Sequence, residues 1–201
     1  MTWDVLNIIG TIAFALSGAF VAIEEKYDLL GIYVLGLVTA FGGGVIRNLL
    51  IGVPVTTLWE QELLLKLALL AMTIVFLLPA SLLSSWKRLL IFFDAIGLAA
   101  FAVQGALHAK AMNLPISAIM IAAMLTGIGG GIIRDILAGR KPLVLREETY
   151  AIWAILAGFL IGIEVVNSSN SLHLYLLALL VICLRLLAVK YNWRLPRRSF
   201  S

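Results

Sequence analysis

The chain has 201 residues, of which 62% are hydrophobic and only 13% are charged, with a formal net charge of +4 and a mean hydropathy of +1.06. Soluble domains carry about 25% charged residues, and their cores cannot hide so much apolar surface. This composition excludes an ordinary soluble domain and predicts a single integral membrane domain over residues 1–201. The small positive charge gives no reason to expect a nucleic-acid partner.

Seven apolar runs follow one another along the chain, each close to the roughly 20 residues that a transmembrane helix needs. They predict an all-α membrane protein with spans at 5–23, 29–50, 62–80, 90–108, 114–138, 148–166 and 172–190. The connections between the spans are too short to hold another domain. The first residues, MTWD, lack the basic flank of a signal peptide, so we expect the first span to be retained.

The basic residues between the spans predict how the helices are oriented. Ten of them fall on one side, in alternate connections and at the C-terminus: Lys26, Lys87, Arg88, Arg140, Lys141, Arg146, Lys190, Arg194, Arg197 and Arg198. The connections on the other side carry only Lys110. Because basic connections tend to stay in the cytoplasm, we predict an external N-terminus and a cytoplasmic, basic C-terminal tail.

Three consecutive glycines and an arginine interrupt the second apolar run, in the stretch TAFGGGVIRNLLIG from Thr39 to Gly52. Each glycine costs about 1 kcal/mol relative to alanine inside a helix, so Gly42, Gly43 and Gly44 favour a bend or a break. Opened backbone at that depth must face protein or water, because unpaired amides are strongly unfavourable in lipid. We therefore expect the glycines to line a polar route, with Thr39 adding a hydroxyl oxygen.

The fifth apolar run repeats this stretch 87 residues later as TGIGGGIIRDILAG, from Thr126 to Gly139, with eight of fourteen positions identical. The same shift aligns IIGTIAFALSG with AIGLAAFAVQG at six of eleven positions, and it pairs Glu60 with Glu147. The chain therefore contains an internal repeat.

The repeat predicts the domain organisation. Residues 1–80 and 88–167 form two copies of a three-helix unit, and residues 168–201 add a seventh helix and the basic tail. Because three is an odd number, the second copy must cross the membrane in the opposite direction to the first. Such inverted repeats are typical of transport proteins, and their related elements meet near the middle of the membrane.

The repeated polar positions are the strongest candidates for a functional site. They are Thr39, Gly42, Gly43, Gly44, Arg47 and Asn48 in the first copy and Thr126, Gly129, Gly130, Gly131, Arg134 and Asp135 in the second. An arginine inside a span indicates a functional site by default. The alternatives are glycines that allow close helix packing and arginines that snorkel to the headgroups. Matched copies in opposite orientation favour conduction, because snorkelling requires no symmetry.

The remaining polar residues give weaker signals. Arg185 lies about a turn from the cytoplasmic end of the seventh span, so we expect it to snorkel, with a pore or gating role as the alternative. His108, His173 and Cys183 share no ligand spacing, so no structural metal site is expected. The chain has no G-x-S-x-G or H-E-x-x-H motif, and its scattered carboxylates do not predict an enzyme.

The paired GGG-x-x-R-[ND] motifs on the second and fifth of seven spans, in a 3+3+1 arrangement of 201 residues, resemble the prokaryotic branch of the trimeric intracellular cation (TRIC) channels. This branch has also carried a glycine-transporter label. The resemblance covers nearly the whole chain. It implies a homotrimer in a prokaryotic inner membrane, surrounded by lipid, in which each subunit has its own pore for monovalent cations, chiefly potassium.

The resemblance also implies where the pore lies. It places the glycine-bent second and fifth helices near the constriction, with Arg47 and Arg134 beside them, and it requires no cofactor beyond the permeant potassium or sodium ions. Asp135 is the better candidate for attracting a cation, because the first copy has Asn48 at that position. Positive charge repels a permeant cation unless it is paired, turned away or used as a gate, and the sequence leaves all three open.

A secondary transporter of glycine or another small zwitterion is the alternative function. The oppositely charged ends of two broken helices can hold a carboxylate and an amine at the same time.

Overall fold

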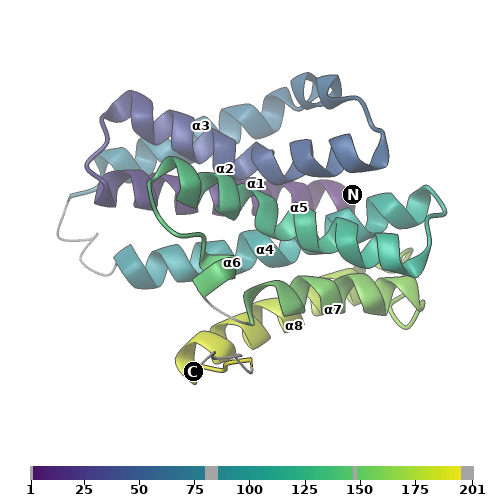
Figure 1. Ribbon diagram of the computed structural model, residues 1–201. Helices are drawn as coiled ribbons and strands as arrows, with labels where there is room; N and C mark the ends of the chain where they lie inside the picture. The colour runs from purple at the N-terminus through teal and green to yellow at the C-terminus, as the bar shows by residue number, and fades with distance from the viewer. Residues whose placement is uncertain (1, 80–85, 147–148, 196–201) are drawn as a thin grey trace.

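A computed structural model describes residues 2–79, 86–146 and 149–195 (Figure 1). The helices in these ranges are α1 Thr2–Glu24, α2 Leu29–Ile51, the 3-10 helix η1 Val55–Glu60, α3 Glu62–Leu77, α4 Trp86–Ala111, α5 Ile116–Leu137, α6 Leu143–Arg146, α7 Tyr150–Gly162 and α8 Ser171–Lys190. Three residues used above, Glu147, Arg197 and Arg198, lie outside the described ranges.

Five of the described helices, α1, α2, α4, α5 and α8, are long and apolar enough to cross a membrane, as an integral membrane protein requires. The predicted spans 62–80 and 148–166 correspond to α3 and α7, which have only 16 and 13 residues. Thirteen helical residues extend about 20 Å, less than the roughly 30 Å of a hydrocarbon layer. Helix α3 ends early because Leu78 precedes a proline and adopts an extended conformation. The count of seven spans stays a prediction.

Short polar residues and glycine set the ends of several helices. The Asp28 side chain caps α2 by accepting a hydrogen bond from the Gly31 amide at 2.8 Å, and Asn170 caps α8 in the same way. Gly52 ends α2 in the left-handed conformation, with φ +74°, and Gly139 follows α5 with φ +69°. These local signals explain why the predicted ends of the spans lie close to the observed ones.

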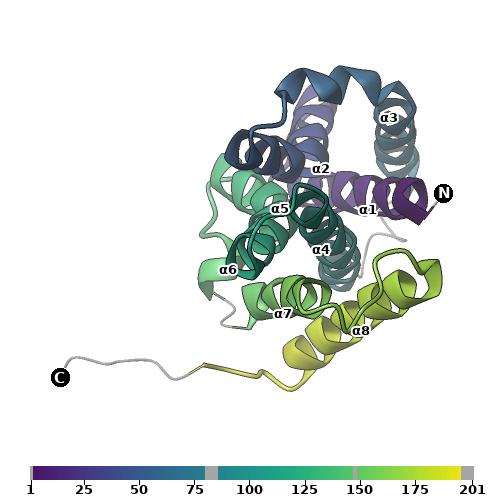
Figure 2. The same cartoon turned by 90° about the vertical axis from the view of Figure 1, so that its right-hand side faces the viewer.

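Helices α1, α2 and α3 gather in one part of the molecule and α4, α5 and α7 in another, with α8 packed against α4 and α7 (Figure 2). The two parts meet where α1 crosses α4. There the rings of Phe14 and Phe101 lie 5.2 Å apart, and a Cβ on Gly10 or Gly97 would crowd the ring from the opposite helix. The 87-residue shift relates Phe14 to Phe101 and Gly10 to Gly97, so the two copies meet through equivalent residues.

Candidate functional site

The glycine triplets of α2 and α5 lie where these two helices cross. A Cβ added at Gly43 would overlap the backbone carbonyl oxygen of Thr126, and one added at Gly130 would overlap that of Thr39. Gly43 and Gly130 are equivalent under the 87-residue shift, as are Thr39 and Thr126. The middle glycine of each copy therefore contacts the threonine of the other copy. Residues without a side chain allow two helix backbones to approach this closely. The triplets therefore bring α2 and α5 into backbone contact.

The glycines do not break their helices. Both α2 and α5 remain α-helical through their triplets, so the backbone is not opened there. The packing contacts at the crossing offset the low helix propensity of glycine, because only glycine permits them. A bend within the unbroken helices stays a prediction.

The outer glycines of the triplets have different surroundings. Gly44 lines a polar cavity that is described below, whereas Gly42 borders an apolar groove of about 540 Å³. A Cβ on Gly129 would crowd Ile46 of α2, and one on Gly131 would lie 3.4 Å from the Tyr150 hydroxyl. A Cβ on Gly42 would likewise crowd Ile133 of α5, so the triplets are equivalent at their first and middle glycines and differ at Gly44 and Gly131.

The two threonines are fully buried and bonded within their own helices. The Thr39 hydroxyl donates to the carbonyl oxygen of Leu35, and the Thr126 hydroxyl donates to that of Ala122, both at 2.6 Å. This back-bonding satisfies the hydroxyl hydrogen, and bonds of this kind often bend a helix slightly. The predicted contribution of their oxygens to a pore stays a prediction.

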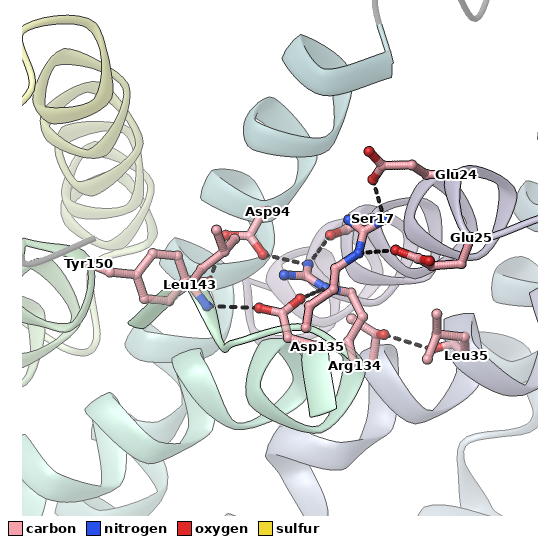
Figure 3. A network of polar contacts seen from close by, with 11 residues as sticks. Ser17, Glu24, Glu25, Leu35, Asp94, Arg134, Asp135, Leu143 and Tyr150 are labelled. Carbon is pink, nitrogen blue, oxygen red and sulfur yellow. Dashed lines mark hydrogen bonds and ion pairs between the residues drawn. The ribbon is translucent and has the colours of Figure 1, made fainter. Parts of the chain in front are cut away.

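Arg134 of α5 has no exposed surface and is held by two carboxylates (Figure 3). Its Nη1 lies 2.7 Å from Asp94 Oδ1 of α4, and its Nε donates to Asp135 Oδ1 at 2.8 Å. Nη1 also donates to the hydroxyl of Ser17 on α1. A buried charge is tolerated when it is paired and hydrogen-bonded in this way. Of the three states left open by the sequence, Arg134 is in the paired one.

Further contacts hold the two carboxylates. Asp135 Oδ2 accepts from the backbone amide of Leu143 at 2.8 Å, and Asp94 Oδ2 accepts from the Tyr150 hydroxyl at 2.6 Å. The Arg185 guanidinium carbon lies 4.5 Å from the centre of the Tyr150 ring, within cation–π distance. These residues are called the Arg134 network: Ser17, Asp94, Arg134, Asp135, Leu143, Tyr150 and Arg185.

The position of Arg185 corrects one expectation. Its side chain is only 1% exposed, so it does not snorkel to the headgroups. It points inward because α8 packs against α4 and α7, where the Tyr150 ring offers a favourable face. A gating role for Arg185 stays a prediction.

A clasp near the surface joins α1 to the C-terminal end of α5, at the same end of the molecule as the Arg134 network (Figure 3). Arg140 pairs with both Glu24 and Glu25, and the Tyr27 hydroxyl donates to the carbonyl oxygen of Leu137 at 3.1 Å. Through these contacts the α1–α2 connection covers the end of α5.

Arg47 of α2 is the first-copy equivalent of Arg134, but it has no carboxylate partner within the described ranges. Its Nε and Nη2 donate to Asn48 Oδ1 at 3.0 and 2.8 Å. The amide nitrogen of Asn48 in turn donates to Thr57 Oγ1 at 3.2 Å. Amide oxygens carry no net charge, so the charge of Arg47 is solvated but not neutralised.

Arg47 and Asn48 line a polar cavity of about 370 Å³ at the end of the molecule opposite the Arg134 network. This Arg47 cavity is lined by Asp4, Asn7, Thr11, Ala40, Phe41, Gly44, Arg47, Asn48, Val53, Thr57, Leu58, Glu60, Gln61, Phe101, Gln104 and His108. Asp4 and Glu60 are exposed at its rim. Gln104 is 2% exposed, and its Nε2 has no hydrogen-bond partner among the residues that the structure describes.

Sequence reasoning missed several of these residues, above all Asp94, Tyr150 and Gln104. The internal repeat could have pointed to Asp94 and Gln104. Extending the second alignment by one residue pairs Asn7 with Asp94, and the alignment as it stands pairs Ser17 with Gln104. Polar residues at matched depth in two spans indicate a shared site. Tyr150 carried no such signal, because its first-copy equivalent is Leu63.

The fold and the site together define a class: an all-helical membrane protein with an internal sequence repeat, whose α2 and α5 cross at glycine triplets. The family model described as "Glycine transporter" matches residues 4–80 and 91–164, close to the two predicted copies. Together with the solved structures below, this match shows that the chain belongs to the prokaryotic TRIC family.

Relatives in other bacteria and solved structures resemble the chain over almost its whole length. The UPF0126 membrane protein YvgT of Bacillus subtilis is 58% identical over 100% of this chain and 98% of its own. The UPF0126 inner membrane protein YadS of Escherichia coli K12 is 36% identical over 95% and 93%.

The solved structures are TRIC channels. A TRIC cation channel studied for its conductance is 37% identical with a TM-score of 0.84 and covers 100% of this chain and 99% of its own. A prokaryotic TRIC channel crystallised in 0.5 M KCl is 32% identical with a TM-score of 0.86, over 96% and 98%.

Proposed function

We propose that this chain forms a monovalent cation channel, chiefly permeable to potassium, with one pathway inside each subunit. The similarity to TRIC cation channels at 37% and 32% identity supports the broad class and argues against an enzyme. Within this chain, one observation carries the proposal: equivalent arginines lie on either side of the α2–α5 crossing, one in a polar cavity and one in a paired network.

The pathway that we infer begins in the Arg47 cavity, which extends inward to Gly44 of α2 and Phe101 of α4. Next comes the α2–α5 crossing, where the backbones at Gly43 and Gly130 touch. Last comes the Arg134 network between α1, α4 and α5. Backbone contacts at the crossing and ion pairs in the network leave no passage there in this proposal, so we infer that the described conformation is that of a closed channel.

Opening, in this proposal, requires Arg134 to leave its two carboxylates. Asp135 pairs with Arg134 through one oxygen and accepts from the Leu143 amide through the other, so its charge is already compensated in the closed conformation. If Arg134 moves aside, Asp94 and Asp135 face the pathway and attract cations. Arg134 then acts as a gate, which removes the difficulty of an arginine beside a cation route.

The proposal includes the membrane arrangement. We infer seven spans, two inverted copies, an external N-terminus and a cytoplasmic C-terminus from the distribution of basic residues. A homotrimer is inferred from the relative in Rhodobacter sphaeroides, 29% identical and with a TM-score of 0.84, which is described as a trimeric intracellular cation channel. An inner-membrane location is supported by the Escherichia coli relative, an inner membrane protein.

Glycine transport remains the second candidate, favoured by the description of the matching family model. A transporter needs a group that anchors the glycine carboxylate, and Arg134 is the obvious choice from sequence. In the structure, however, Arg134 already binds Asp94 and Asp135. It would have to release one carboxylate to accept another, and channel opening in this proposal requires the same release. The similarity to TRIC cation channels, rather than the contacts of Arg134, therefore favours the channel.

Single-channel recordings in planar bilayers, paired with glycine uptake into liposomes of the same preparation, test the proposal. A channel gives resolvable unitary currents whose reversal potential follows the potassium gradient. Saturable glycine uptake without potassium currents would establish the transporter instead.

A further inference from the structure

We propose that the Arg47 cavity binds a small carboxylate anion, which supplies the direct counter-charge that Arg47 lacks within the described ranges. The inference concerns ligand binding at this cavity and does not depend on whether the protein conducts ions.

The first argument is a comparison inside the chain. Arg134 has carboxylate oxygens at 2.7 and 2.8 Å from Asp94 and Asp135. The 87-residue shift places Asn7 and Asn48 at the equivalent positions around Arg47, and neither carries a charge. Arg47 is nevertheless only 6% exposed. A guanidinium with so little access to solvent is stabilised by a counter-charge, and the cavity beside it has room for one.

The second argument is the set of hydrogen-bond donors that face the cavity. Arg47 uses Nε and Nη2 to bind Asn48, which leaves the Nη1 edge of the planar group for another acceptor. Gln104 contributes a second donor, because the residue lines the same cavity and its buried Nε2 has no partner among the described residues. A buried donor without a partner is unfavourable until a ligand or water accepts its hydrogen bond. A guanidinium and an amide N–H together fit a carboxylate, which accepts at both oxygens.

The third argument concerns the size and the rim of the cavity. A volume of about 370 Å³ lies in the lower part of the range of small-molecule sites. Asp4 and Glu60 at the rim repel ligands with several negative charges. The two carboxylates would, however, tolerate an ammonium group on the same ligand. The ligand that fits therefore has a single carboxylate. It is either a simple monocarboxylate or a zwitterion such as an amino acid.

Thermal unfolding of the purified full-length protein in detergent tests the inference. Sodium acetate is compared with sodium chloride at equal ionic strength, glycine is compared with methylammonium chloride, and the Kd is fitted from the logarithmic rise of Tm with concentration. A ligand that binds only the folded state should raise the apparent Tm by about 5 °C at a concentration of about 100 times its Kd. We expect shifts with acetate and glycine and none with methylammonium. A larger shift with glycine than with acetate identifies the zwitterion as the better source.

Two variants and a control locate the effect. Asn48→Asp places a carboxylate on Arg47 as in the second copy, so it should raise the basal Tm and abolish the acetate shift. Arg47→Gln should also abolish the shift, whereas Arg140→Gln, a loss of one arginine at the opposite end, should retain it. The proposal is overturned if acetate does no more than chloride for the parent protein, or if Asn48→Asp keeps the full acetate shift. The Asn48→Asp result stands even if Arg47→Gln fails to fold.

Discussion

Two arginines occupy equivalent positions in the two copies of the repeat, and their surroundings differ. Arg134 has no exposed surface and pairs with Asp94 and Asp135. Arg47 lies beside a polar cavity and donates hydrogen bonds to Asn48. The contacts at the α2–α5 crossing, in contrast, are the same from both sides. The repeat therefore preserves the geometry of the crossing while the charge on either side of it has diverged.

Two substitutions account for most of this difference. Asparagine at positions 7 and 48, in place of aspartate at 94 and 135, removes two negative charges from the first-copy site. The second-copy site is closed by ionic contacts, whereas the first stays open and its arginine has no ion-pair partner within the described ranges. In the proposed function, the Arg134 network is the gate of the pathway and the Arg47 cavity is its vestibule. Four predictions test this comparison, from the largest expected effect to the smallest.

Asp94→Asn should have the largest effect, because it leaves the fully buried Arg134 short of one counter-charge. Breaking a buried ion pair costs about 3–5 kcal/mol, and the free energy of unfolding in detergent measures that loss. The matched control is Asn7→Asp, which adds a carboxylate near Arg47 and should be neutral or stabilising. Equal losses in the two variants would mean that the two sites do not differ in charge compensation.

Gly43→Ala and Gly130→Ala should each destabilise the protein by about 1–3 kcal/mol, because the added Cβ meets a backbone carbonyl that cannot easily move. The two losses should be similar, since the crossing is where the copies are alike. Gly44→Ala is the control: its Cβ would meet only Arg47 Nη2, at 3.9 Å, and it should gain stability from the better helix propensity. A large difference between Gly43→Ala and Gly130→Ala would contradict the symmetry of the crossing.

Arg47→Gln should raise the single-channel potassium conductance about twofold at low salt, because it removes a positive charge that has no ion-pair partner from the proposed vestibule. At 1 M salt the Debye length falls to about 3 Å, and the increase should largely disappear. Recordings at both salt concentrations check this. An equal increase at both concentrations would show that the side chain obstructs the pathway by its size instead.

Arg140→Gln should have the smallest effect on stability. Arg140 is partly exposed in its pairs with Glu24 and Glu25, and such pairs contribute less than about 1 kcal/mol. The free energy of unfolding should therefore stay close to that of the parent protein. A loss of unfolding free energy as large as that of Asp94→Asn would show that the clasp stabilises this end of the molecule as strongly as the Arg134 network does.

Much of the fold could be predicted from the sequence, because apolar length and the 87-residue repeat are local or periodic signals. The predicted spans around α1, α2, α4, α5 and α8 lie within a few residues of the observed helices. The sequence predicted a bend or a break at the glycine triplets; the structure has no break there, and a bend stays a prediction. Propensity alone could not show that Gly43 faces the carbonyl of Thr126, because that contact joins residues far apart in the chain.

The polar site was predicted less completely than the fold. Arg134 and Asp135 are adjacent in sequence, so their pairing could be considered, but Asp94 and Tyr150 come from other helices. Arg185 was expected at the headgroups because it lies near a helix end. Its actual partner, the Tyr150 ring, is apparent only once α7 and α8 are placed together. The position of a residue along a helix therefore predicts its depth in the membrane. The partner of its side chain depends on which helices pack together.

The most direct test of the difference between the two ends compares cysteines at two equivalent positions, Gln104 and Ser17. In a background in which the exposed Cys183 is replaced by alanine, each single-cysteine variant is treated with a membrane-impermeant, negatively charged methanethiosulfonate reagent from either side. The cavity should admit the reagent to Gln104→Cys from one side, helped by the charge of Arg47, whereas Ser17→Cys in the closed network should stay unmodified from both. Modification of Ser17→Cys as fast as Gln104→Cys in the resting protein would contradict the account of one open and one sealed end.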